Sequence, residues 1–278
     1  MDRHPDPGGL GGAVLLAERT MTLLASLQAA PPEARAAWAS RLADLPPDKA
    51  DALLRAVHQE VLLRCQSDGW FWTSFVTTKD EADPAQSTKP FPRNREDVRR
   101  WWEILTTKKK IAAAKSRQVF CTWGTSAYMC HTARFKANTA VLYQTQSEDD
   151  ANNVVSVSGS SKDGGYAGRC QFIERNLPVW MQQPIRDIEG QITYPNGSII
   201  MALPGGANKV RGKTGTVIVL DEMAFLEEAK GTYTAIAPLI QKGAQLICMS
   251  TPNGGAGNFF YHLWHGLALD AVTPVEAG

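Results

Sequence analysis

The sequence predicts an α/β fold in which a mainly parallel central sheet is flanked by helices. Short apolar segments typical of strands alternate along most of the chain with segments of helical spacing, a pattern that is typical of parallel sheets. One of these segments, residues 216–220 (TVIVL), is continuously apolar, as expected of a strand that is buried on both faces. The 278 residues are enough for one large domain or two small ones.

The first 67 residues are rich in alanine and leucine and predict a helical N-terminal appendage. Prolines on both sides of residues 33–45 favour a helix there. Over residues 48–65 apolar side chains recur at helical spacing, which predicts another helix. The polar, proline-containing stretch 80–92 predicts a linker within a connecting region, residues 68–92.

Residues 93–278 form the predicted core domain, in which strands and helices alternate. The expected strands are residues 111–114, 139–143, 198–203, 216–220 and 245–249. A helix is expected over residues 127–135, and a polar helix follows the strand at 139–143. The glycine- and serine-rich stretch 156–168 predicts a mobile loop.

Composition excludes several classes of protein. Lysine and arginine total 29 and aspartate and glutamate 28, a net charge of +1 that argues against a polybasic protein. There is no run of about 20 apolar residues and no secretory signal at the start, so we expect a cytoplasmic protein without a membrane span. The five cysteines form no C-x-x-C pair, which favours reduced, buried thiols over a zinc site.

Asp221 and Glu222 come directly after the apolar strand at residues 216–220. A carboxylate at the C-terminal end of a buried strand lies at the edge where ligands bind in open α/β sheets. There Asp221 can hold the magnesium ion of a nucleotide, and Glu222 can polarise a water for attack on a γ-phosphate. An acidic turn after a strand is also common, so this motif alone leaves both interpretations open.

A phosphate-binding loop is expected upstream, but the chain has no G-x-x-x-x-G-K-[ST] motif. After the strand at residues 111–114 comes AKSRQVFCTW, residues 114–123, where a loop leads into a helix and backbone N–H groups attract anions. Lys115 can supply the cation that phosphates need, with Arg117 as a second candidate, and Thr122 the hydroxyl for magnesium. Basic residues before a helix are often only solvated, so the residue pattern alone does not decide.

Taken together, these motifs resemble those of the large terminase subunits of tailed bacteriophages, the ATP-driven motors that pump DNA into procapsids. The resemblance covers roughly residues 68–262 and consists of segments that agree in order and spacing. They are PFP at 90–92 before Trp101 and Trp102 (the adenine-side entry), KSRQVFCTW at 115–123 (a deviant Walker A), VLYQTQSEDDA at 141–151, residues 192–225 (the run into Walker B) and CMSTPNG at 248–254 (the coupling motif).

The resemblance implies a RecA-like P-loop NTPase fold that binds ATP and Mg²⁺, with roles for particular residues. Lys115 would contact the β- and γ-phosphates, Thr122 and Asp221 would hold magnesium, and Glu222 would position the attacking water. The remaining ATP-binding residues would be Ser116, Arg117, Gln118, Val119, Phe120 and Cys121. Ser250 and Thr251 would sense the γ-phosphate and relay hydrolysis to a DNA-gripping surface.

Arg211 matches a family arginine that reaches the nucleotide of a neighbouring subunit, where such a finger can increase the rate by ~10³–10⁵. A surface arginine in a turn beside Gly212 is the alternative.

Phe120 stands where the usual loop has glycine, and a bulky residue does not adopt positive φ cheaply, so we expect a different loop conformation. The segment from Lys89 to Arg117 contains ten basic residues and only three acidic ones. This local excess of positive charge indicates either a surface that contacts DNA or an ordinary solvated surface.

The resemblance also implies partners: double-stranded DNA, a portal protein ring, a small terminase subunit and further copies of the chain in a homo-oligomeric, pentamer-like ring. The expected location is the cytoplasm of a bacterial host, transiently at the procapsid portal and not as a stable virion component. The family's C-terminal nuclease has no counterpart before Gly278, so we expect no DNA cleavage by this chain. Two alternatives stay open: a catalytically idle remnant that binds nucleotide or a partner without turnover, and a helicase-like translocase, which would require a second RecA-like domain.

Overall fold

The computed structural model describes residues 45–79, 88–116, 120–157, 167–203, 215–266 and 273–277. The chain divides into two compact units, residues 1–68 and 69–278, which are described separately. In the first unit, helix α3 (Pro47–Ser67) begins with a proline, which suits a first turn because its N–H needs no helical partner. This helix confirms the one predicted over residues 48–65. Residues 1–44, with most of the other predicted helix, lie outside the described residues.

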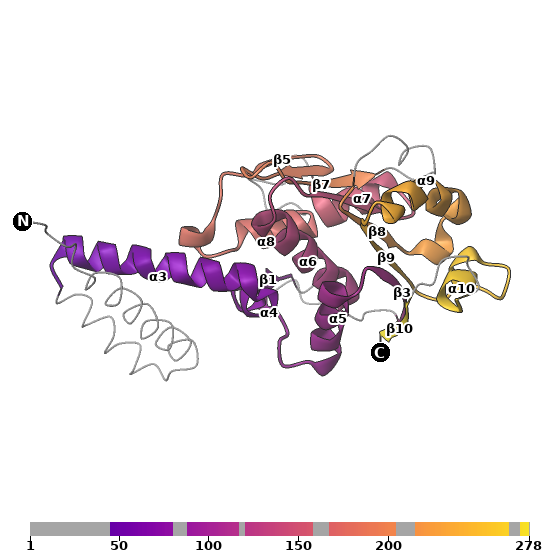
Figure 1. The fold of residues 1–278 in the computed structure, drawn as a ribbon, viewed down its shortest axis with the longest axis horizontal. Coiled ribbons are helices and arrows are strands. Elements are labelled where there is room, and N and C mark those ends of the chain that lie inside the picture. Colours follow the sequence, from indigo (N-terminus) through magenta and orange to yellow (C-terminus); the bar gives the residue numbers. More distant parts are fainter. Residues whose placement is uncertain are drawn as a thin grey trace, which may run out of the picture. The chain divides into compact units, whose positions relative to one another are not determined.

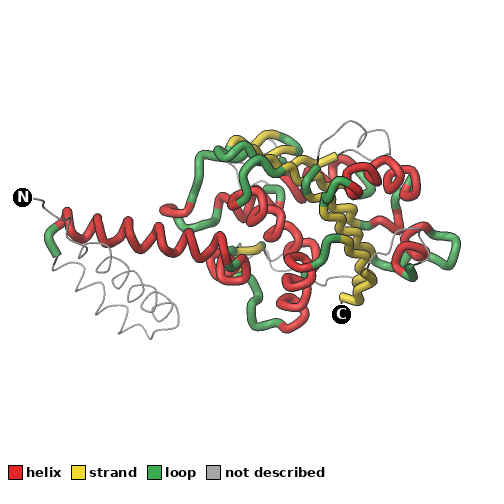
Figure 2. Tube along the Cα trace, viewed as in Figure 1, coloured by secondary structure: helices red, strands yellow, loops and turns green. Residues whose placement is uncertain are grey.

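The second unit is built from short strands alternating with helices (Figures 1 and 2). Its strands are β1 (Thr77–Thr78), β2 (Lys89–Pro90), β3 (Lys110–Lys115), β4 (Ala140–Gln144), β5 (Arg186–Ile188), β6 (Gln191–Thr193), β7 (Ile199–Leu203), β8 (Val217–Asp221), β9 (Gln245–Ser250) and β10 (Thr273–Ala277). Its α-helices are α4 (Gly69–Trp72), α5 (Glu96–Thr107), α6 (Cys121–Phe135), α7 (Glu148–Val155), α8 (Arg169–Arg175), α9 (Ala229–Gln241) and α10 (Phe259–Trp264). Short 3₁₀ helices are η1 (Thr73–Phe75), η2 (Val179–Met181) and η4 (Met223–Phe225).

Eight of these strands form one sheet in the order β10–β3–β9–β8–β4–β7–β6–β5. All pairs from β10 to β7 are parallel, and the pairs of β6 with β7 and with β5 are antiparallel. All five strands expected from the sequence are present. The mainly parallel sheet, with β9 inserted between β3 and β8, confirms the predicted α/β class. The antiparallel edge was not predicted, because β5 and β6 have three residues each and are too short for a period to be recognised.

The helices pack in two groups, one on each side of the sheet (Figure 1). In the first group α5 and α8 both contact α6, and in the second α9 contacts α10. The core of the second group buries apolar side chains from the central strands and from both helices, including Ala112, Ile218, Leu246, Ile236 and Phe260. Helices on both faces explain why β8 is buried along its whole length, as its apolar sequence predicts.

Helix α5 approaches α6 closely because α6 has a glycine at the contact. A Cβ atom on Gly124 would lie 3.0 Å from Cδ1 of Trp101, closer than ordinary van der Waals contact. The Trp101 indole N–H also donates to Oγ1 of Thr125 at 3.1 Å. The indole ring is therefore held by packing against Gly124 and by a hydrogen bond to Thr125. The contact places α5 beside the helix that begins at the predicted phosphate loop.

The connecting region predicted at residues 68–92 contains regular structure in its described part. Residues 69–78 form α4, η1 and β1, and β1 pairs with β2 in an antiparallel ribbon. Aromatic packing explains why these residues form regular structure. Trp72 is fully buried, and Phe91 makes edge contacts with Trp70, Trp102 and Phe120. Residues 80–87, the most polar part of the stretch, lie outside the described residues.

The structure also bears on the predicted state of the cysteines and on membrane-spanning helices. All five cysteines are free and buried, as predicted. Burial raises the pKa of the Cys121 thiol to about 12 and also raises the pKa of the Cys248 thiol. Within the described part of the chain, no helix combines the length and the apolar character needed to cross a membrane.

Candidate nucleotide and catalytic site

The predicted site residues come from the C-terminal ends of three neighbouring strands. Lys115 is the last residue of β3, Asp221 of β8 and Ser250 of β9. Since β9 pairs in parallel with both other strands, these ends lie at one edge of the sheet. Helix α6 begins at the same edge and brings Thr122 in its first turn. This is the edge where open α/β sheets bind ligands.

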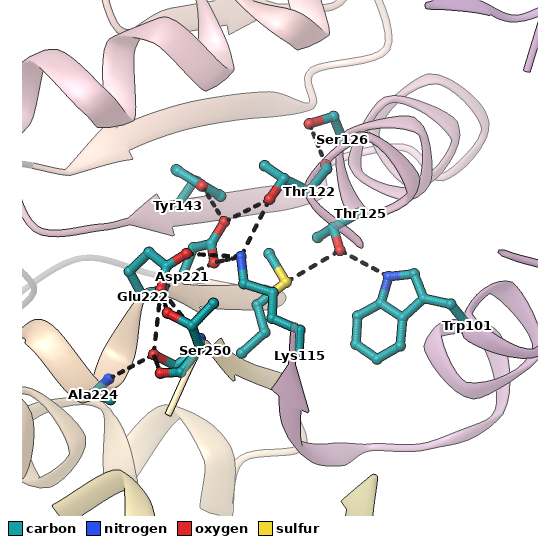
Figure 3. Close-up of polar contacts among 12 residues, drawn as sticks. Trp101, Lys115, Thr122, Thr125, Ser126, Tyr143, Asp221, Glu222, Ala224 and Ser250 are labelled. Carbon is teal, nitrogen blue, oxygen red and sulfur yellow. Dashed lines mark hydrogen bonds and ion pairs between the residues drawn. The ribbon is translucent and has the colours of Figure 1, made fainter. Parts of the chain in front are cut away.

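A buried ion-pair cluster occupies this edge (Figure 3). The Lys115 ammonium group donates to Oδ1 of Asp221 at 2.7 Å and lies 3.1 Å from Oε1 of Glu222. The side chains of Lys115 and Asp221 are only 7% and 4% exposed. Burial lowers the pKa of the lysine, but the charges and hydrogen bonds of the two carboxylates outweigh burial and raise that pKa above its usual value. Lys115 is therefore charged, and the two carboxylates hold it at the C-terminal edge of the sheet.

Thr122 and Asp221 are adjacent, as a shared metal ion requires. The Thr122 hydroxyl donates to Oδ2 of Asp221 at 3.1 Å and accepts from Nζ of Lys115 at 3.4 Å. A hydroxyl and a carboxylate are oxygen ligands that Mg²⁺ prefers, and this ion commonly takes its other ligands from water and substrate phosphates. The described residues contain no cluster of three or more His, Cys, Asp or Glu that could hold a metal by itself. The two oxygens thus fit a nucleotide-bound magnesium and not a closed structural metal site.

Glu222 has a strained backbone and a well-held side chain. Its φ and ψ are 49° and 39°, the left-handed conformation that non-glycine residues adopt rarely and often at functional sites. Oε2 of Glu222 accepts hydrogen bonds from the backbone N–H of Thr251 at 3.2 Å and from the Thr251 hydroxyl at 3.1 Å. The Ser250 hydroxyl lies 3.4 Å from the same oxygen and is closer, at 2.8 Å, to the Thr251 carbonyl that accepts from it. The predicted coupling residues therefore contact the predicted catalytic carboxylate directly.

Asp221 also accepts a hydrogen bond from a residue that the motifs did not single out. The hydroxyl of Tyr143, on β4, donates to Oδ2 of Asp221 at 2.9 Å, and the ring is almost completely buried. Burial, reinforced by the negative charge of Asp221, holds the pKa of this phenol well above its usual value, so the hydroxyl stays protonated. In the sequence Tyr143 reads as one more apolar residue of a strand, and only the pairing of β4 with β8 reveals the contact.

Phe120 stands where the usual phosphate loop has a glycine. Its φ is −68°, so the residue has no positive φ to accommodate, and it precedes the first residue of α6. Its ring packs edge-on against Phe91 with ring centroids 5.1 Å apart. Phe120 thus starts α6 with an ordinary negative φ. Ser116 is exposed at the end of β3, whereas Arg117, Gln118, Val119 and Arg211 lie outside the described residues.

A cavity of about 680 Å³ opens beside the ion-pair cluster. One wall is the end of β3, at Ala114, Lys115 and Ser116, and the others come from residues 252–258 and α10. Aromatic side chains of α10 and its C-terminal end form the apolar part of the lining: Phe260, Tyr261, Trp264 and His265. The cavity is therefore apolar on one side and reaches the charged lysine on the other.

No protein-family model matches the sequence. Among solved structures, the chain is similar to the large terminase ATPase domain of Thermus phage P74-26, with a TM-score of 0.44 and 18% identity over 57% of this chain and 64% of that chain. It is similar to the HK97 bacteriophage large terminase with a TM-score of 0.48 and 11% identity over 70% and 40% of the two chains. For the large terminase of the thermophilic bacteriophage D6E in complex with ADP, the TM-score is 0.40 and the identity 14% over 57% and 38%. Each similarity spans less than two thirds of the compared chain.

Proposed function

We propose that this chain is the ATP-hydrolysing motor domain of a viral DNA-packaging terminase. The observation that carries the proposal is the convergence, at one sheet edge, of a buried lysine, a threonine hydroxyl and two acidic side chains on separate elements. Lys115, Thr122, Asp221 and Glu222 are the groups that phosphoryl transfer to water needs: a cation for phosphates, two magnesium ligands and a carboxylate for the nucleophile. The ordered sequence motifs that resemble large terminases supply the family.

In this proposal the lysine exchanges its carboxylate partners for phosphate oxygens when ATP binds. Lys115 then neutralises the phosphates from the end of β3, and Thr122 and Asp221 are free to hold magnesium through the two oxygens that lie 3.1 Å apart. The bound ion supplies charge neutralisation at the β- and γ-phosphate oxygens. Glu222, released from Lys115 but still held by Thr251, accepts a hydrogen bond from the attacking water and orients it.

The cavity beside Lys115 is the proposed place for the nucleoside half of ATP. Its lining passes from the lysine to aromatic rings, and an aromatic ring offers a stacking surface for a purine base. The resemblance to terminases implies a different position for the base, near residues 90–92. The described part of that segment is packed, because Phe91 is only 4% exposed and contacts three aromatic rings.

One observation favours the alternative of an idle remnant. The same ion pairs that assemble the site also occupy Lys115, since both of its carboxylate partners lie within 3.1 Å. Phosphates must compete with these partners for the lysine. If they compete poorly, the chain binds nucleotide or a partner without turning ATP over.

The deciding experiment is steady-state phosphate release with Mg-ATP, with and without duplex DNA, together with equilibrium ATP binding. We expect Glu222→Gln to retain ATP binding and to lose turnover by about 10²–10⁴-fold, the usual contribution of a general base. Lys115→Ala should lose ATP binding as well. Lys110→Ala is the matched control, because Lys110 lies at the opposite end of the same strand. A wild-type protein that binds ATP but releases no phosphate, even with DNA, would establish the idle remnant.

The wider assignments belong to the same proposal. Duplex DNA, a portal ring, a small terminase subunit and a ring of identical subunits would be the partners, in the cytoplasm of a bacterial host and transiently at the procapsid portal. Stimulation of phosphate release by duplex DNA would support a DNA-coupled motor. The exposed basic residues from Arg93 to Lys109 are candidates for the contact, although Arg95 and Arg99 already pair with Asp97 and Glu103.

A further inference from the structure

We propose that Tyr143 is a positioning residue that fixes the orientation of Asp221 for the metal ion. The inference rests on the proposed function and adds to it a residue from a strand that carries none of the predicted site residues. Its hydroxyl donates to Oδ2 of Asp221 at 2.9 Å, and its side chain is among the largest fully buried ones (Figure 3).

Four donors surround the Asp221 carboxylate. Oδ1 accepts from Lys115 at 2.7 Å and from the backbone N–H of Glu222 at 2.8 Å. Oδ2 accepts from Thr122 at 3.1 Å and from Tyr143 at 2.9 Å. Each oxygen thus has two donors of different kinds. Lys115 and Thr122 are also proposed to bind the nucleotide or the metal, whereas the Glu222 N–H and the Tyr143 hydroxyl are not.

These two kinds of partner behave differently when substrate binds. Lys115 and Thr122 have other tasks in the proposed reaction and leave or loosen their contact with Asp221. The Glu222 N–H and the Tyr143 hydroxyl remain, one on each oxygen, and two fixed donors prevent the carboxylate from rotating. Without Tyr143, Oδ2 would lose its one permanent partner, and a buried carboxylate oxygen without a donor is costly.

The sheet explains why Tyr143 can do this. Strand β4 lies directly beside β8 in parallel register, with Tyr143 opposite Val219 and Gln144 opposite Leu220. The tyrosine is long enough to reach the end of the neighbouring strand, two positions further along. Hydrogen bonds of this kind to a metal ligand commonly change metal affinity by about 10–100-fold.

The test compares Tyr143→Phe with Tyr128→Phe, a matched control. Tyr128 is also buried and its hydroxyl donates to Oε1 of Gln245 at 2.6 Å, so its replacement removes a comparable hydrogen bond without touching Asp221. The readouts are Mn²⁺ affinity of the ADP-bound protein by electron paramagnetic resonance, ADP affinity without divalent ions, and the thermal midpoint. The full chain is used throughout.

We expect Tyr143→Phe to weaken Mn²⁺ binding about 10-fold or more, with ADP affinity in the absence of metal unchanged. Tyr128→Phe should leave both affinities at the wild-type level, whatever it does to the thermal midpoint. Wild-type Mn²⁺ affinity in Tyr143→Phe would overturn the assignment and leave the proposed function standing. A wild-type protein that binds no metal–nucleotide complex would overturn both.

Discussion

At the scale of single residues, the position of Glu222 depends on a few short contacts. Its left-handed backbone turns the side chain away from the line of β8, and Thr251 holds one carboxylate oxygen with both its N–H and its hydroxyl. The other carboxylate oxygen faces Lys115 at 3.1 Å. If a phosphate displaced Lys115, as the proposed function requires, Thr251 would remain as the main hydrogen-bond donor to Glu222 and would determine where the carboxylate lies.

The first prediction concerns Thr251→Val, which removes the hydroxyl and keeps the backbone N–H contact. A hydrogen bond to a charged group is worth about 1.5–3 kcal/mol, so turnover should fall about tenfold or more while ATP binding changes little. Phosphate release and ATP affinity are measured in parallel. Thr234→Val is the control, because the Thr234 hydroxyl is on the exposed face of α9 and bonds only to the carbonyl of Lys230 among the contacts described. An unchanged turnover in Thr251→Val would show that the side chain does not orient Glu222.

At the scale of elements, the turn after β8 and the segment leading into α10 are joined by hydrogen bonds. The Ala224 N–H donates to Oγ of Ser250, and the Ala224 carbonyl accepts from the side-chain amides of Asn253 and Asn258 at 3.3 and 2.6 Å. Asn258 also caps α10 by accepting from the N–H of Phe260. The acidic turn and α10 are thereby connected through asparagine side chains that line the cavity.

The second prediction follows from the position of α10 beside that cavity. Tyr261 is 36% exposed and lines it, so Tyr261→Ala removes a stacking surface at small structural cost. If the base binds there, ATP affinity should fall about 5-fold or more, since base–aromatic stacking is worth about 1–3 kcal/mol. Tripolyphosphate, which has no base, should bind as before, and Tyr261→Phe should restore ATP binding. An equal loss for both ligands, or no loss, would place the base elsewhere.

At the scale of the whole molecule, the candidate site is assembled from segments that are far apart in the sequence. Lys115 and Asp221 are 106 positions apart, and Tyr143 and Ser250 come from two further strands of the same sheet. The site therefore depends on the sheet being complete from β3 to β4. Arg211, the candidate finger, would act on the nucleotide of a neighbouring subunit, so full activity would also depend on assembly.

The third prediction tests that dependence by mixing variants. Arg211→Ala chains retain Glu222, and Glu222→Gln chains retain Arg211, so a mixture contains intact sites that can receive an arginine from a neighbour. Phosphate release should exceed the sum of the separate variants and should rise with protein concentration, as should the wild-type rate. Absence of rescue at every mixing ratio would argue against an arginine that acts between subunits.

The α/β class and the residues with recognisable chemistry could be predicted from local patterns in the sequence. Period and composition are local properties, so an apolar run such as residues 216–220 and the acidic pair after it could be recognised without knowledge of their neighbours. The burial of the cysteines and the helix over residues 48–65 followed from the same kind of information. The resemblance of ordered motifs to a family added the roles.

Which side chains contact one another could be learned from the folded chain alone. Strand order and register create the main contacts of the site. They are the ion pairs of Lys115 with Asp221 and Glu222, the hydrogen bond from Thr251 to Glu222 and the hydrogen bond from Tyr143 to Asp221. No local pattern encodes these relations, because partners come from elements separated by many residues. The same reason explains the packed ribbon in place of a linker: Phe91 is buried by rings that lie elsewhere in the chain.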